Sequence, residues 1–484
     1  MNDNKTLKHK VFSGVIWKGL ERICAQFVST VVSIILARIL MPDDYSVVSI
    51  AAIFFAFCNL FISSGLNTAL IQKKDADILD YSTVFTVSLS IAAVLYIVMF
   101  FCAPTIANLY RKALVTPVIR VLGLTFFVNA YKSILSAKIS SNMEFRKFFY
   151  STIIGTVISA IVGIAMAVKG YGVWALVAQQ MTNSIIDSAI LTITAKVRFQ
   201  LSFSYERFKP LFSFGGKIFL ASIISTIYDE CRPLIVGLKF STTDLAFYNK
   251  GQSFPSLINS IGNNTLSSAL FPAMAKVQEN KDNILSMTRR FMKLSSFVVF
   301  PMMLGMLGIS ESFVRVVLTE KWLPIVPYMR LFSVAFMLDL IQVGNLQAIR
   351  ALGRSDLILK MEIIKKSSYA VVIAFAVILA KTPLLLASTG IATSLIATIV
   401  NTYPNKKLIG YGFLQLFSDL IPNLLPAILM AGIVLLMNRL NMNMYLLILS
   451  QLLVGCMSYI LFCTVFRNEN LLYIKNSFSG ILRR

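Results

Sequence analysis

Residues 82–103 read STVFTVSLSIAAVLYIVMFFCA, a run of 22 residues that contains no charged side chain. A bilayer core about 30 Å thick is crossed by roughly 20 apolar residues in a helix, which pairs all its backbone polar groups internally. This run therefore predicts a membrane-spanning helix. The whole chain has the same character, since 57% of its 484 residues are hydrophobic and only 14% are charged. A water-soluble protein of this composition could not bury its apolar surface, so the sequence predicts an integral membrane protein.

Similar runs recur along the whole chain and predict an all-α polytopic protein with about fourteen transmembrane helices. They fall near 12–37, 45–69, 82–103, 116–137, 149–168, 172–195, 211–238, 252–274, 290–309, 324–348, 360–380, 384–401, 416–437 and 443–466. No segment between them is long enough to form a soluble domain. Two further segments, 199–208 and 311–322, mix aromatic and charged residues, as short amphipathic helices at the membrane surface do, and ordinary polar helix ends stay open as the alternative.

The formal net charge of +23 has a second meaning on a membrane chain. On a soluble protein it would indicate nucleic acid, but in membrane proteins basic residues gather in cytoplasmic loops. When the amino terminus is placed inside, the cytoplasmic loops carry nearly three times as many Lys and Arg residues as the opposite loops. The sequence therefore predicts an even number of spans with both termini in the cytoplasm, and no nucleic-acid partner.

The sequence lacks the residue patterns of several kinds of catalytic and metal-binding site. His9 is the single histidine and lies in the amino-terminal tail, so we predict no His-based catalytic or metal site within the spans. No Gly-rich phosphate loop is present, so we expect no ATPase, no catalytic residues and no cofactor. The pair Asp43–Asp44 follows Pro42 and precedes a span, a pattern typical of a helix start instead of a metal ligand pair.

Polar residues share single faces of several predicted spans. Lys18, Glu21 and Arg22 are spaced for one helix face, as are Asn183 and Asp187. Charge inside a bilayer is costly, so such faces predict a water-filled cavity suited to an anionic, hydroxyl-rich substrate. For each charge, a snorkelling side chain or a structural ion pair stays open as an alternative. The candidate cavity residues are Lys18, Arg22, Lys132, Gln180, Asn183, Lys217, Arg232, Asn259, Asn263 and Asn264, and the acidic candidates are Asp187, Asp229, Glu230 and Asp339.

The chain also contains a weak internal repeat. A shift of 200 residues brings eleven residues of the first 70 onto identical ones, including Phe12 onto Phe212, and Asp44 onto Asp244. This offset predicts two parallel six-helix lobes around a central cavity, residues 1–196 and 197–407, followed by two extra helices and a cytoplasmic tail, residues 408–484.

Motifs at the same positions resemble a known family. The segments 34–45 (IILARILMPDDY), 65–73 (GLNTALIQK), 233–237 (PLIVG), 245–250 (LAFYNK) and 270–278 (LFPAMAKVQ) are similar to those of Wzx-type polysaccharide flippases, in their teichuronic-acid and colanic-acid exporter branch. These belong to the multidrug/oligosaccharidyl-lipid/polysaccharide exporter superfamily. The resemblance implies a transporter of the bacterial inner membrane that turns undecaprenyl-diphosphate-linked oligosaccharide repeat units to the periplasmic leaflet by alternating access. The product would be lipopolysaccharide, capsule or exopolysaccharide.

Under this hypothesis the basic cavity residues screen the diphosphate and the amides exchange hydrogen bonds with sugar hydroxyls. The four acidic residues become candidates for coupling to a proton or sodium ion. The family also implies contacts with a polysaccharide polymerase and a chain-length regulator. A small-molecule or drug-cation antiporter of the same superfamily is the alternative function. A membrane enzyme is the least favoured, because no loop is large enough for a catalytic domain.

Overall fold

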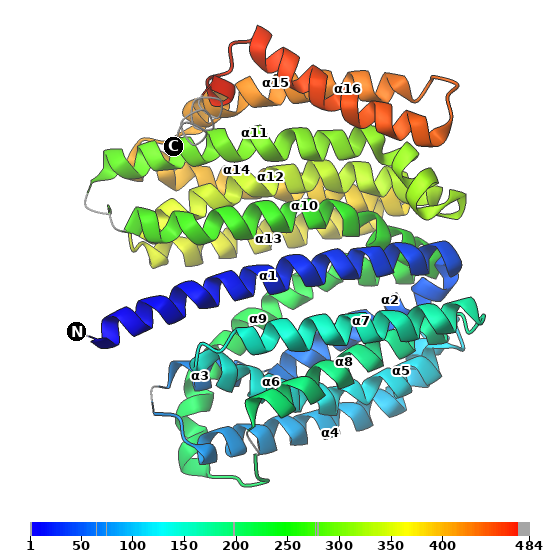
Figure 1. Ribbon diagram of the computed structural model, residues 1–484, viewed down its shortest axis with the longest axis vertical. Helices are drawn as coiled ribbons and strands as arrows, with labels where there is room; N and C mark the ends of the chain where they lie inside the picture. Colours follow the sequence, from blue (N-terminus) through cyan, green and yellow to red (C-terminus); the bar gives the residue numbers. More distant parts are fainter. Residues whose placement is uncertain are drawn as a thin grey trace. The chain divides into compact units, whose positions relative to one another are not determined.

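A computed structural model shows a helical protein (Figure 1). It describes residues 2–63, 65–73, 75–196, 199–275, 277 and 280–472, and the side chains of these except 2–13, 15, 261–269, 271–273, 275 and 355. No strand occurs in these ranges. The chain divides into two compact units after Ala246. The all-α fold predicted from the sequence is confirmed.

The first unit contains nine helices among the described residues and the start of a tenth. They are α1 (Asn2–Ile39), α2 (Pro42–Ser63), α3 (Leu66–Gln72), α4 (Ile78–Leu109), α5 (Val115–Gly123), α6 (Thr125–Ser141), α7 (Arg146–Val168), α8 (Val173–Ala195) and α9 (Tyr205–Lys239). The predicted span 116–137 is thus a pair of helices that meet at Leu124.

The second unit holds the remaining helices. They are α10 (Thr242–Ala275), α11 (Lys281–Phe313), α12 (Val326–Ala351), α13 (Ser355–Leu379), α14 (Pro383–Ile409), α15 (Phe413–Met437) and α16 (Met444–Val465), with a π-helical turn (Val314–Leu318) and a 3-10 turn (Glu320–Ile325) between α11 and α12.

Neither predicted amphipathic surface helix is present as such. Residues 199–204 form an irregular segment, and α9 begins only at Tyr205. This segment hydrogen-bonds to α4, where the backbone N–H of Gln200 donates to Ser82 Oγ and Thr86 Oγ1 donates to the carbonyl of Ser202. The residues from 311 onward finish α11 and form the two short turns instead.

Eleven helices in the described part are long and apolar enough to cross a membrane. Three more, α8, α10 and α13, have 23, 34 and 25 residues, which is enough length for a span. The fourteen predicted spans are therefore compatible with the structure. Large apolar side chains point outward on these helices, such as Phe101 and Ile378, which are 74% and 78% exposed. Such exposure is expected where the surroundings are lipid and not water.

The offset of 200 residues is repeated in the backbone. The helix pair α1–α2 turns between Ile39 and Pro42, and α9–α10 turns between Lys239 and Thr242. Both turns are closed in the same way. The backbone N–H of Met41 donates to Asp44 Oδ2 at 3.0 Å, and that of Ser241 donates to Asp244 Oδ2 at 3.2 Å. A carboxylate in the first helical turn also interacts favourably with the helix dipole, so the prediction that Asp44 marks a helix start is confirmed.

Candidate functional site

One charged contact inside the spans joins α6 to α8. Lys132 Nζ lies 2.5 Å from Asp187 Oδ2, and the Asp187 side chain is only 7% exposed whereas that of Lys132 is 34% exposed. The second oxygen, Asp187 Oδ1, is buried without a hydrogen-bond partner. From the sequence, Lys132 is predicted to be a cavity cation and Asp187 a separate ion-coupling acid. The structure brings them together as one ion pair.

Helix α7 packs against α8 next to this ion pair. A Cβ atom on Gly155 would lie 3.2 Å from Asp187 Cβ and 3.3 Å from Asn183 Oδ1, so glycine lets α7 approach α8 closely here. Asn183 and Gln180 are exposed on α8 beside the pair. Exposed amides next to a partly exposed ammonium can exchange hydrogen bonds with hydroxyl and phosphate oxygens.

The polar face of α1 is partly neutralised. Lys18 Nζ lies 2.6 Å from Glu21 Oε2 and 4.6 Å from the centre of the Phe148 ring, and Thr152 Oγ1 donates to Glu21 Oε1 at 3.3 Å. The structural ion pair that the sequence left open for Lys18 is thus present. Arg22 is exposed one turn further along, and within the described residues it has no carboxylate partner. Of Lys18 and Arg22, Arg22 is therefore the one available to an anionic ligand.

Helix α9 carries four of the predicted residues. Lys217 is exposed and lines an open concavity together with Ala221, Ser222 and Ser225 of the same helix. Arg232 Nη2 donates to Tyr228 Oη at 2.7 Å, and its guanidinium stacks on that ring. Asp229 is exposed and Glu230 is half-buried on the next faces of the helix. The polar residues of α9 thus lie around the helix and not on one line.

The candidates in the second unit are dispersed. Asp339 on α12 accepts hydrogen bonds from Gln342 Nε2 at 3.0 Å and from Ser394 Oγ of α14 at 2.9 Å. Asn259 is half-buried on α10. Asn263 and Asn264 lie on the same helix, but their side chains fall outside the described residues.

A buried amide cluster between α12 and α14 was missed from the sequence. Asn405 Nδ2 donates to Asn345 Oδ1 at 2.9 Å, and Asn345 Nδ2 donates to Thr402 Oγ1 at 3.0 Å. All three residues are fully buried. The spacing of Asn401, Thr402 and Asn405 on one helix was a usable signal, because these residues cannot face lipid without a partner.

A second network ties α15 and the residues after α16 to α11. Arg289 Nη2 lies 2.8 Å from Asp419 Oδ1, a carboxylate with no exposed surface, and Lys293 Nζ lies 2.9 Å from Glu469 Oε2. The hydrogen bond that Lys293 donates holds the pKa of the Glu469 carboxyl below the usual range of a glutamate. Asn423 continues the network by accepting from Asn468 and Asn470. This network holds α15 and the residues after α16 to α11 within the second unit.

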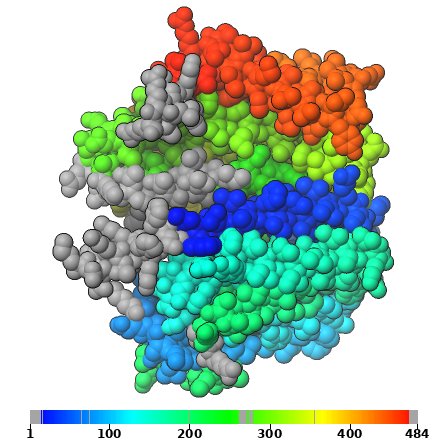
Figure 2. All heavy atoms as spheres, viewed as in Figure 1, coloured from blue at the N-terminus to red at the C-terminus, as the bar shows by residue number. Residues whose placement is uncertain are grey.

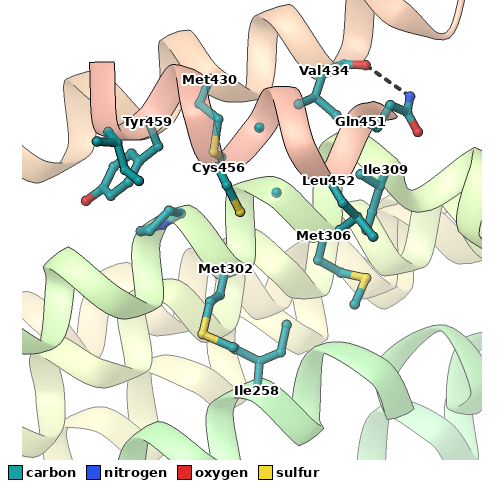
Figure 3. Close-up of a pocket in the computed structure, with 14 residues that line it drawn as sticks. Ile258, Met302, Met306, Ile309, Met430, Val434, Gln451, Leu452, Cys456 and Tyr459 are labelled. Atoms are coloured by element: carbon teal, nitrogen blue, oxygen red, sulfur yellow. Dashed lines mark hydrogen bonds between the residues drawn. The ribbon is translucent and has the colours of Figure 1, made fainter. Parts of the chain in front are cut away.

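The second unit also has an apolar pocket of about 370 Å³ between α11, α15 and α16 (Figure 3). Met302, Met306 and Cys456 project into it, and Gln451 at its rim donates to the carbonyl of Val434 at 3.2 Å. None of the described residues that line it is charged, so the pocket suits a hydrocarbon group and not a sugar or a phosphate.

Long apolar helices with charged side chains held among them define a polytopic membrane protein, and the comparisons with known proteins show its family. A family model described as "Polysaccharide biosynthesis protein" matches residues 35–327. This chain belongs to that family, which confirms the resemblance found in the sequence motifs.

Individual relatives and a solved structure are similar over most of the chain. The lipopolysaccharide biosynthesis protein WzxC of Escherichia coli (strain K12) is 23% identical over 370 residues, 74% of each chain. The teichuronic acid biosynthesis protein TuaB of Bacillus subtilis (strain 168) is 22% identical over 361 residues, 73% of each chain. The lipid II flippase MurJ in an inward closed conformation has a TM-score of 0.75 at 16% identity, covering 94% of this chain and 98% of the other. The flippase fold predicted for the chain is therefore confirmed.

Proposed function

We propose that this protein is a flippase that carries an undecaprenyl-diphosphate-linked oligosaccharide from the cytoplasmic to the periplasmic leaflet by alternating access, in the synthesis of lipopolysaccharide, capsule or exopolysaccharide. One observation carries the proposal. A member of a polysaccharide biosynthesis family holds cationic side chains within its apolar helices, among them Arg22, Lys132 and Lys217. A diphosphate crossing a bilayer needs such counter-charges.

The remaining chemistry follows from the same proposal. Amides such as Asn183 replace water at the sugar hydroxyls, and a proton or sodium gradient acting on Asp187, Asp229, Glu230 or Asp339 drives the cycle. We infer a location in the bacterial inner membrane with both termini cytoplasmic, and contacts with a polysaccharide polymerase and a chain-length regulator. The two six-helix lobes, residues 1–196 and 197–407, are the proposed moving parts, and no enzymatic step is assigned.

The test is to follow the lipid-linked repeat unit in a strain that lacks this gene. The flippase function predicts that the units accumulate where a periplasmic ligase cannot reach them, and that the intact gene restores access. Units that still reach the ligase, in a strain without another flippase, would contradict it. Accumulation of dyes in the same strain would instead favour the small-molecule antiporter.

The cationic residues give a sharper version of the test. We expect Arg22→Ala and Arg232→Ala each to lower polymer export at least tenfold, because each removes a counter-charge for the diphosphate. Arg354→Ala is the matched control, since Arg354 lies between α12 and α13 and pairs with Asp356 at 2.8 Å. Normal export by both cavity variants would show that these cations do not carry the substrate.

A further inference from the structure

An arginine at the start of α7 lies over two adjacent aromatic rings, whose centres are 6.3 Å apart. The guanidinium carbon of Arg146 lies 5.4 Å from the centre of the Trp17 ring on α1 and 5.3 Å from that of Tyr150. Its Nη2 and Nε atoms also donate to Tyr150 Oη, at 2.9 and 3.2 Å. Trp17 packs edge-on against Phe149, with ring centres 5.2 Å apart. The position of the guanidinium is therefore fixed by contacts from two helices.

This cluster lies at the boundary of two membrane spans. The predicted spans 12–37 and 149–168 begin close to this cluster, with Trp17 in the first turns of one and Arg146 three residues before the other. The two helices run side by side in the first unit and adjoin in the space-filling view (Figures 1 and 2). Trp and Tyr collect at the level of lipid headgroups, where one end of the side chain is apolar and the other is wet. Arg146 is therefore held at headgroup depth.

Arg146 has no carboxylate partner among the described residues, although its neighbour does. Lys147 Nζ lies 2.5 Å from Glu144 Oε2. Arg146 is exposed, and its contacts with the described residues are to neutral groups, the two rings and a phenol oxygen. The edge formed by Nε and Nη2 donates to Tyr150, so the Nη1 side of the guanidinium is left for an anion, and its planar donor geometry suits the oxygens of a phosphate.

Further cations continue from this point along α1. Lys18 follows Trp17 directly and is paired with Glu21, and Arg22 lies one turn beyond Lys18. One helical turn advances about 5.4 Å. A phosphate held by Arg146 is thus about one to two turns from Arg22, which lies deeper in the span and has no carboxylate partner among the described residues. Lys18 stands between them with its charge already balanced.

We propose that Arg146, stacked on Trp17 and Tyr150, is an entry site for the phosphate group of a lipid headgroup, from which the phosphate passes to Arg22. The ligand class is a phosphate-bearing lipid. The inference rests on the proposed function for the identity of that lipid, the diphosphate-linked substrate, while an anionic phospholipid is the other source of the same chemistry. In the sequence, Arg146 is one of the basic residues that the charge bias of the loops places on the cytoplasmic side.

Binding can be measured on the full-length protein in phosphatidylcholine nanodiscs, independently of transport. Undecaprenyl diphosphate and, separately, phosphatidylglycerol are titrated in and bound lipid is counted by native mass spectrometry. We expect Arg146→Ala to weaken binding of undecaprenyl diphosphate at least tenfold. Arg146→Lys should weaken it severalfold, because lysine keeps the charge but loses the stacked, forked geometry. Lys147→Ala is the matched control, since it removes one positive charge at the adjacent position.

Each result decides the proposal. Loss confined to undecaprenyl diphosphate supports a substrate entry site, and an equal loss of phosphatidylglycerol supports a general phosphate headgroup site. An equal effect of Lys147→Ala, or no effect of Arg146→Ala in protein whose thermal unfolding is unchanged, would overturn it. If the lipid-linked units still reached the ligase in the gene-deletion test while Arg146→Ala weakened lipid binding, the proposed flippase function would be wrong. The lipid-binding site at Arg146 would still be supported.

Discussion

At the scale of single residues, the ion pair between Lys132 and Asp187 contributes to the stability of the fold. The carboxylate is buried and only one of its oxygens is paired, so the ammonium is its main compensation. Removal of one partner of a buried pair costs about 3–5 kcal/mol, and since Lys132 is a third exposed we expect the lower end for Lys132→Met. Thermal unfolding in nanodiscs measures the loss.

The control for this prediction is the double variant. Lys132→Met with Asp187→Asn removes both charges, so no uncompensated carboxylate is left, and much of the lost stability should return. A double variant as unstable as Lys132→Met alone would show that the two side chains are not energetically coupled. Because each residue also belongs to the proposed transport path, export is measured separately and does not enter the stability cycle.

At the scale of helices, the contact of α9 with the α2–α3 turn depends on two glycines. A Cβ atom on Gly65 would lie 2.2 Å from the carbonyl oxygen of Gly215 on α9, and Gly65 has a φ of 68°. Gly65→Ala therefore meets both a backbone collision and left-handed strain. We expect it to destabilise the protein by more than about 3 kcal/mol, in the range of changes that disrupt packing.

Gly353 provides a matched control for the strain alone. Its φ is 70°, but a Cβ atom there would have no neighbour within 4 Å. Gly353→Ala should thus cost only the left-handed penalty of about 1–2 kcal/mol. The difference between the two variants in thermal unfolding measures the steric contact with α9. Equal losses would mean that α9 moves aside without cost.

Helices were also the scale at which the sequence was most informative. Apolar runs and the 200-residue offset predicted the helices and the recurring turn at Asp44 and Asp244, because both depend on residues close together in the chain. The partner of each polar face could not be predicted. Lys132 and Asp187 are 55 residues apart, and periodicity shows which residues share a face without showing which helix that face meets. Arg146 was missed for the same reason, since its rings come partly from α1.

At the scale of the whole molecule, the helices make a prediction about sidedness. If every long helix from α14 to α16 crosses the membrane, three crossings separate Lys381, before α14, from Glu469, after α16. The bias of basic residues in the loops predicts that Lys381 faces the periplasm and Glu469 the cytoplasm. Both are exposed, so cysteines placed there are accessible to reagents.

In intact cells a membrane-impermeant maleimide should label Lys381→Cys. It should label Glu469→Cys only after the cells are permeabilised. The unmodified chain gives the baseline labelling of its own cysteines. Labelling of both cysteines from outside would contradict an odd number of crossings between them. The reverse pattern would show that the protein has the opposite orientation in the membrane, in conflict with entry of the substrate from the cytoplasmic leaflet.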